Sequence, residues 1–156
     1  MEGLLIAIFG GAMAVALAGY GSSIGVGLAG SAANGVLSED PDKFGNMLLL
    51  VALPGTQGIY GFLVGFLVII KIGLLTGNIP DISVIKGAQI FGACVPVAIA
   101  GLTSAPYQGR VCAAGIAVAA KHPEAVMRAL IYGALVETYA VLGLVASIFF
   151  LNGIKL

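Results

Sequence analysis

Charge is what this sequence has least of. Only 9% of its 156 residues are charged, seven acids balance seven bases, and tryptophan is absent. A soluble domain carries about 25% charged residues, so the composition excludes a soluble globular protein. The zero net charge also excludes a disordered chain and an electrostatic nucleic-acid binder. Hydrophobic residues make up 60% of the chain and the mean hydropathy is +1.10, so lipid must contact most of the surface.

Cysteine is also scarce. Cys94 and Cys112 lie in apolar runs and are separated by 18 positions. On one helix this separation is ~27 Å, too far for a disulfide within a chain, so we predict neither a disulfide nor a cysteine metal site. Glu2 stands where a signal peptide has basic residues, and the following apolar stretch is too long for one. We therefore expect no cleaved leader.

Four long apolar segments dominate what is present. Each exceeds the ~20 residues that span a bilayer, and apolar residues occur all round rather than at every second position, which favours helices over barrel strands. The segments are roughly Gly3–Leu37, Phe44–Leu75, Val84–Ala120 and Glu124–Leu151. We predict an all-α membrane protein with four transmembrane helices in a single membrane domain, residues 1–156.

The chain contains an internal repeat. The offset that places Pro41 on Pro123 also places Thr56 on Thr138 and superimposes several glycines. We predict two helical hairpins, repeat one over residues 1–75 and repeat two over residues 84–156. Each hairpin crosses the membrane twice, so both must insert with the same orientation. Both hairpin loops then lie on one side, and the termini with the 76–83 loop lie on the other.

Small residues form stripes on the first and third helices. Gly25-Val-Gly-Leu-Ala-Gly30 matches the dinucleotide pattern GxGxxG, but it lies within a membrane span and lacks the preceding strand. We interpret it as packing, because small residues let helix backbones approach closely. The stripes are Gly21, Ser23, Gly25 and Gly27, and Gly101, Ala105, Cys112, Gly115 and Ala119. We predict that the first and third helices form a tight layer.

One carboxylate lies deep in the membrane. Glu137 is fourteen positions beyond Pro123 and stands near the centre of the fourth helix. An ionised carboxylate there costs at least ~3 kcal/mol, so it must be protonated, paired or bound to a cation. Intramembrane acids usually mark ion pathways. The structural alternative is a neutral glutamic acid that hydrogen-bonds neighbouring helices.

Three neutral polar side chains lie at the same depth as Glu137. Thr56, Gln57 and Gln108 are about as far along the chain from the proline of their own hairpin loop as Glu137 is from Pro123. The helical rise places all four ~21–24 Å from the same surface. Pro54 lacks an N–H and frees a nearby carbonyl. Oxygen ligands with one negative charge suit a small monovalent cation; taken alone, Thr56 and Gln57 fit ordinary interhelical hydrogen bonding equally well.

Further polar groups flank this plane. Tyr60 and Tyr139 could each donate a hydroxyl to the carboxylate, and Tyr60 lies one turn from Thr56 on the same face. Arg110 lies at almost the depth of Glu137, but it is ~200° around the helix from Gln108. We expect Arg110 to face elsewhere; an Arg110–Glu137 ion pair is the alternative. The repeat-one counterpart of Glu137 is Gly55, so only one hairpin carries an acid.

These motifs resemble the duplicated four-helix proteolipid (K or c) subunit of V-type and A/V-type rotary ATPases, in particular its sodium-translocating branch. The motifs are Leu53-Pro-Gly-Thr-Gln-Gly-Ile-Tyr-Gly-Phe62, Tyr107-Gln-Gly-Arg110 and Val136-Glu-Thr-Tyr139. The resemblance covers the whole chain. Pro106, just before Gln108, departs from the family's pattern and favours a kink in the third helix.

The resemblance implies an ion site and its ligands. Sodium, with the proton as the alternative coupling ion, is bound by the Glu137 carboxylate, the Thr56 hydroxyl, the Gln57 and Gln108 amide oxygens and the Leu53 backbone carbonyl. Tyr60 resembles the tyrosine that hydrogen-bonds the glutamate. The chain would be an ion-translocating, non-catalytic subunit, with ATP hydrolysed on other subunits.

The resemblance also implies partners. Copies of the chain form a ring with the first and third helices inside, in contact with lipid and with a stator subunit that presents an arginine to Glu137. The loops at 38–43 and 121–123 face the cytoplasm of a prokaryotic cell and grip the central stalk, and the termini face outside the plasma membrane.

Two other functions compete with this one. A small four-helix cation-coupled secondary transporter would use Glu137 as its coupling site, but such transporters often have inverted repeats, whereas this repeat is parallel. A purely structural tetraspan leaves the coplanar polar residues unexplained.

Overall fold

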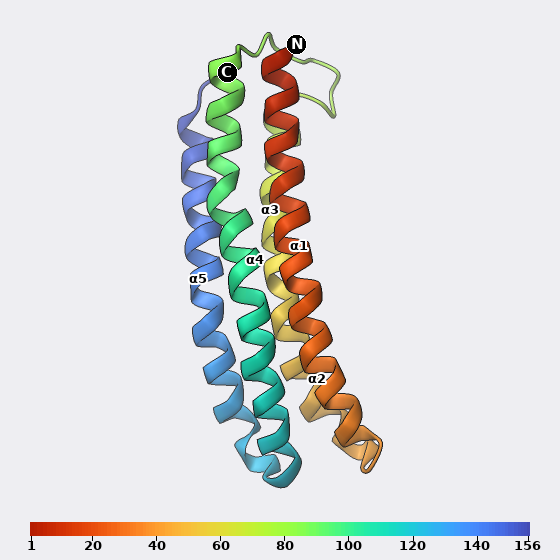
Figure 1. Ribbon diagram of the computed structural model, residues 1–156. Coiled ribbons are helices and arrows are strands. Elements are labelled where there is room, and N and C mark those ends of the chain that lie inside the picture. Colours follow the sequence, from red (N-terminus) through yellow and green to blue (C-terminus); the bar gives the residue numbers. More distant parts are fainter.

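The computed structural model describes residues 1–156 and contains helices and no strands (Figure 1). The long helices are α1, Glu2–Leu37, α4, Val84–Lys121, and α5, Val126–Gly153, and the second crossing is divided into α2, Phe44–Ala52, and α3, Thr56–Lys71. Four segments are long and apolar enough to cross a membrane. The predicted all-α membrane fold is confirmed.

The four crossings stand side by side as two hairpins. Figure 1 shows both hairpin turns at one end of the molecule, and both termini with the connection before α4 at the other. Short 3₁₀ turns, Pro41–Lys43 and Pro123–Ala125, open the second crossing of each hairpin. This is the arrangement that two parallel repeats predict.

α1 and α4 form the closest helix pair in the protomer. A Cβ atom added to Gly21 would lie 2.5 Å from the Gly101 carbonyl oxygen, and one added to Gly25 would contact the Ala105 carbonyl. The predicted tight layer of the first and third helices is therefore present. Gly27 has no heavy atom within 4 Å of such a Cβ, because residues two apart point ~200° apart around a helix. Only alternate members of the predicted stripe make the contact.

The end of the second crossing differs from the prediction. α3 ends at Lys71 rather than at Leu75. Gly73 adopts φ 71°, a left-handed conformation that glycine adopts at low cost. The Gly73 N–H donates to the Ile70 carbonyl and the Leu74 N–H to the Ile69 carbonyl, both at 3.1 Å. These two bonds form a Schellman motif, which stops the helix although the following residues are apolar.

Two prolines affect the crossings differently. Pro54 lies in a 3₁₀ segment, Leu53–Gly55, that separates α2 from α3. Pro106 lies inside α4, which continues as helix to Lys121. Pro106 therefore does not interrupt the α-helix, and Gln108 is fully buried.

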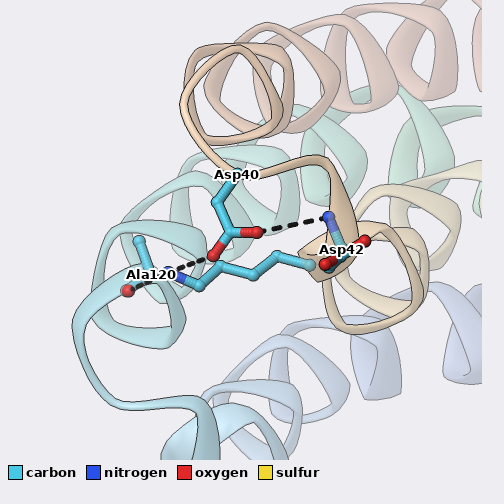
Figure 2. A network of polar contacts seen from close by, with 4 residues as sticks. Asp40, Asp42 and Ala120 are labelled. Atoms are coloured by element: carbon cyan, nitrogen blue, oxygen red, sulfur yellow. Dashed lines mark hydrogen bonds and ion pairs between the residues drawn. The ribbon is translucent and has the colours of Figure 1, made fainter.

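The two hairpin turns are joined by Lys43 (Figure 2). Its ammonium donates to the carbonyl of Ala120, near the C-terminus of α4, at 2.9 Å. It also pairs with the Asp40 carboxylate at 3.3 Å, and Asp40 accepts the backbone N–H of Asp42. A cation at a helix C-terminus is favourable because unpaired carbonyls and the helix dipole make that end negative. The contact fixes the first turn to the second hairpin.

Two apolar clusters enclose the middle of the protomer. One lies toward the termini and includes Val64, Val68 and Ile90. The other lies toward the hairpin turns and includes Leu50 and Ile116. The polar residues of the second, third and fourth crossings stand between these clusters, so water is excluded from both sides along the helix axes.

Candidate ion-binding site

Glu137 on α5 is half-buried and is held by two side chains from other helices. Tyr60 of α3 donates its hydroxyl to Glu137 Oε1 at 2.5 Å. Gln108 of α4 places its Nε2 3.5 Å from Glu137 Oε2. The carboxylate therefore joins three helices at one point.

Two buried glutamines form the inner part of the site. Gln57 and Gln108 are each 0% exposed. Gln57 Nε2 donates to Gln108 Oε1, and Gln108 Nε2 also donates to the carbonyl of Gly133 at 3.0 Å. A buried amide without partners is costly, so these bonds hold both side chains in place.

Thr56 and Leu53 supply further oxygens at the break between α2 and α3. Thr56 Oγ1 donates to the Leu53 carbonyl at 2.9 Å and lies 3.4 Å from Gln57 Oε1. The hydroxyl of Ser22 donates to the Pro54 carbonyl at 2.6 Å. At the 3₁₀ segment around Pro54, two backbone carbonyls therefore accept hydrogen bonds from side chains, and the Leu53 carbonyl also accepts the backbone N–H of Thr56.

The structure brings together all six residues predicted for the site. They are Leu53, Thr56, Gln57, Tyr60, Gln108 and Glu137.

Two neighbours of the site point away from it. Tyr139 is 67% exposed and does not bond the carboxylate, so the expectation that it could donate to Glu137 is wrong. Arg110 is exposed and lies over the Tyr107 ring, with its guanidinium carbon 5.3 Å from the centroid. The alternative of an Arg110–Glu137 ion pair is wrong, because Arg110 is ~200° around α4 from Gln108.

Two contributors were missed from the sequence. Gly133 contributes only its carbonyl, one turn before Glu137, and no side-chain pattern reveals that. Ser22 could have been considered, because it lies in the small-residue region of α1 and serine hydroxyls hydrogen-bond across closely packed membrane helices.

The chemistry of the site is that of a single charge among neutral oxygens. No three His, Cys, Asp or Glu side chains are placed so that they could hold a metal ion together, whereas divalent cations are held by several carboxylates. One carboxylate with hydroxyl, amide and carbonyl oxygens matches a monovalent cation or a proton.

Two parallel membrane hairpins around one carboxylate place the chain among duplicated membrane proteolipids. The family of the ATP synthase C subunit matches it twice, over residues 9–68 and 91–150. V-type sodium ATPase subunit K of Enterococcus hirae is 45% identical over 145 residues, which cover 93% of this chain and 89% of that protein. A-type ATP synthase subunit K of Methanocaldococcus jannaschii is 35% identical over 154 residues, which cover 99% of this chain and 65% of that protein.

The chain belongs to the family of the ATP synthase C subunit, in a duplicated form. The second matched segment is offset from the first by the same amount at its start and at its end, and this offset is the one that superimposes the prolines of the hairpin turns. The predicted resemblance to the proteolipid subunits of rotary ATPases is confirmed, as is the prediction of an integral membrane subunit rather than a catalytic one.

Proposed function

We propose that this protein is a rotor-ring subunit of a V/A-type rotary ATPase and that it carries Na⁺ across the membrane on Glu137. The observation that carries the proposal is the convergence of Tyr60, Gln108 and Gln57 on this carboxylate. The name of the Enterococcus hirae relative, a sodium ATPase subunit, favours sodium over the proton. The proton remains the alternative coupling ion.

The proposed ligands are five oxygen donors. They are the Glu137 carboxylate, the Thr56 hydroxyl, the Gln57 and Gln108 amide oxygens and the Leu53 carbonyl. An alkali cation at this depth must exchange its hydration shell for protein oxygens, and hard oxygen ligands do this. Each glutamine amide carries both a donor and an acceptor, so either can turn its oxygen toward a cation. Tyr60 orients the carboxylate through its hydroxyl.

Ion binding would solve the electrostatic problem of rotation. A charged carboxylate facing lipid costs at least ~3 kcal/mol, and a bound cation neutralises it. A stator arginine that approaches Glu137 would compete for the carboxylate and help to release the ion. The Glu137 carboxylate with its bound cation is neutral and moves through lipid, whereas the charged carboxylate stays beside the stator.

The proposed assembly follows the orientation of the hairpins. Copies form a ring with α1 and α4 inside, and the repeats extend over residues 1–75 and 84–156. The turns at 38–43 and 121–123 face the cytoplasm of a prokaryotic cell and contact the central stalk. The termini then lie outside the plasma membrane.

Binding of ²²Na⁺ to the purified ring at a series of pH values tests the proposal. We expect saturable binding that protons inhibit at acid pH, because both ions need the same carboxylate. Glu137→Gln should abolish binding, sodium uptake and ion-coupled ATP hydrolysis while rings still assemble. Undiminished sodium uptake by Glu137→Gln would refute the central assignment, and absence of sodium binding at alkaline pH in the wild type would leave the proton as the coupling ion.

A further inference from the structure

Among the uncovered apolar surfaces of the protomer are two that lie near the hairpin turns, one on each hairpin. The first is a groove of about 660 Å³ on the second hairpin, which we call the α4–α5 groove. Its lining includes Val111, Ala114, Val118, Arg128 and Tyr132. The second, which we call the α1–α2 face, lies on the first hairpin. It includes Asn34, Leu37, Phe44, Leu48 and Val51.

The repeat relates both surfaces to the junction inside the protomer. There, Ala29 of the first hairpin packs in one cluster with Ile116 and Val126 of the second. The offset between the repeats places Ala29 on Val111 of the α4–α5 groove. The same offset in reverse places Ile116 and Val126 on Asn34 and Phe44 of the α1–α2 face. Each hairpin therefore leaves free the flank that its counterpart uses internally.

We propose that the α4–α5 groove of one copy receives the α1–α2 face of a second copy, in the register of the internal junction, and that Arg128 of the first copy binds the acidic 38–43 turn of the second. This inference rests on the proposed ring and adds which surfaces meet and how they are aligned. Contact between two different surfaces propagates from copy to copy and closes into a ring if the rotation permits.

The two turns have complementary charge. The 38–43 turn has three acids and one base, a net charge of −2, whereas residues 121–128 have two bases and one acid, a net charge of +1. The ion pairs of the protomer are Lys43 with Asp40 and His122 with Glu124. Glu39 and Arg128 have no ionic partner within the protomer, so both charges are free to pair across the contact between copies.

The charges at the C-termini of α1 and α4 support the same contact. α4 has Lys121 in its last turn and is bonded by Lys43 at its C-terminal carbonyls, whereas α1 has no basic residue in its last turn. The repeat offset places Ala125 at the position of Lys43. Arg128 lies one turn further on, and its longer side chain brings a cation to the C-terminus of α1 in the next copy.

The same register predicts that no second ion site lies between copies. Glu137 corresponds to Gly55 and Gln108 to Val26. The junction between copies therefore has neither the carboxylate nor the buried amides of the internal junction, and its polar groups at this depth are the hydroxyls of Thr138 and Tyr139, which the offset places on Thr56 and Gln57. A lipid chain would also fill an apolar groove, but it would explain neither the shared register nor the opposite charges.

Cysteine cross-linking tests the register. Within the protomer, a Cβ added to Gly133 would lie 2.8 Å from Leu53 Cδ2, so the repeat offset places Leu135 of one copy against Val51 of the next. In a chain with Cys94 and Cys112 replaced by serine, Val51→Cys with Leu135→Cys should give a ladder of covalent multimers in oxidised membranes. The matched control is Ile59→Cys with Leu135→Cys, since Ile59 is 64% exposed but outside the α1–α2 face; it should give at least tenfold less cross-linking.

Charge reversal tests the role of Arg128. Arg128→Glu should lower the fraction of rings that survive heating in dodecyl sulfate by several-fold, and Glu39→Lys in the same chain should restore it. Two outcomes would overturn the proposed register without affecting the proposed ring. One is a ring that forms without the Val51–Leu135 cross-link, and the other is phospholipid found in the α4–α5 groove by native mass spectrometry. Arg128→Glu without effect would overturn the ion contact. A wild-type chain that is monomeric by native mass spectrometry would overturn the proposed ring as well.

Discussion

Tyr60 connects the carboxylate of α5 to the helix that carries Thr56 and Gln57. Its hydroxyl donates to Glu137 Oε1 at 2.5 Å, and this bond links the two hairpins directly at the carboxylate. Because the bond orients the carboxylate, its loss should affect how long an ion stays bound rather than whether the chain folds.

Tyr60→Phe should therefore increase the dissociation rate of sodium by roughly tenfold, the ~1.4 kcal/mol scale of one lost polar contact. Release of ²²Na⁺ from loaded rings measures this rate. Tyr139→Phe is the matched control, because Tyr139 is 67% exposed and makes no bond to the carboxylate. Equal changes in the two variants would contradict the assigned role of Tyr60.

The neutral ligands should separate sodium from the proton. Gln57→Leu or Thr56→Val keeps the charge but removes an oxygen, so sodium affinity should fall by roughly tenfold or more. A proton needs only the carboxylate and one hydrogen-bond partner, so a carbodiimide should still label Glu137 in these variants at acid pH. Sodium should protect Glu137 from the label in the wild type and much less in the variants. If sodium protected Glu137 fully in both variants, the Gln57 and Thr56 oxygens would only form hydrogen bonds between helices and would not bind sodium.

The depth of the site could be predicted from the sequence, and its orientation only in part. The constant rise of an α-helix placed Thr56, Gln57 and Gln108 level with Glu137. Tyr139 was an incorrect candidate because it lies ~200° around the helix from Glu137, the geometry that correctly set Arg110 aside. Backbone contributors such as the Gly133 carbonyl carry no sequence signal and required coordinates.

At the scale of helices, the hydrophobicity of the sequence predicted the four membrane crossings but not where the helices within them end or are interrupted. The apolar run continues past Lys71, and a single glycine, Gly73, ends α3 through its left-handed conformation. Pro54 and Pro106 look alike in sequence, yet only Pro54 lies at an interruption of the α-helix. The difference lies in the packing around each proline, which a pattern of residue types does not contain.

The α1–α4 contact predicts opposite effects for two glycines of one helix. Gly25→Ala would place a Cβ 2.8 Å from Pro54 Cβ and against the Ala105 carbonyl, which should destabilise the protomer by ~1–3 kcal/mol. Gly35→Ala meets no heavy atom within 4 Å and should be neutral or stabilising by up to about 1 kcal/mol, because alanine favours helix. Thermal unfolding in detergent measures both; equal melting temperatures would show that α1 and α4 do not pack this closely.

At the scale of the whole protein, two similar hairpins differ at the position of the proposed ion-binding carboxylate. Gly55 stands in the first hairpin where Glu137 stands in the second. Sodium binding should therefore saturate at one ion per chain, as measured by equilibrium dialysis of ²²Na⁺ against protein concentration from amino-acid analysis. A stoichiometry near two would require a second site that lacks a carboxylate.

The bond from Lys43 to the Ala120 carbonyl has a mechanical consequence. It bridges the two turns at the end of the molecule that the central stalk is proposed to contact. A lateral force on either turn is then transmitted to both hairpins, so the hairpins resist shear together and do not separate. Elastic energy would be stored in the stalk rather than lost in bending the protomer that it pushes.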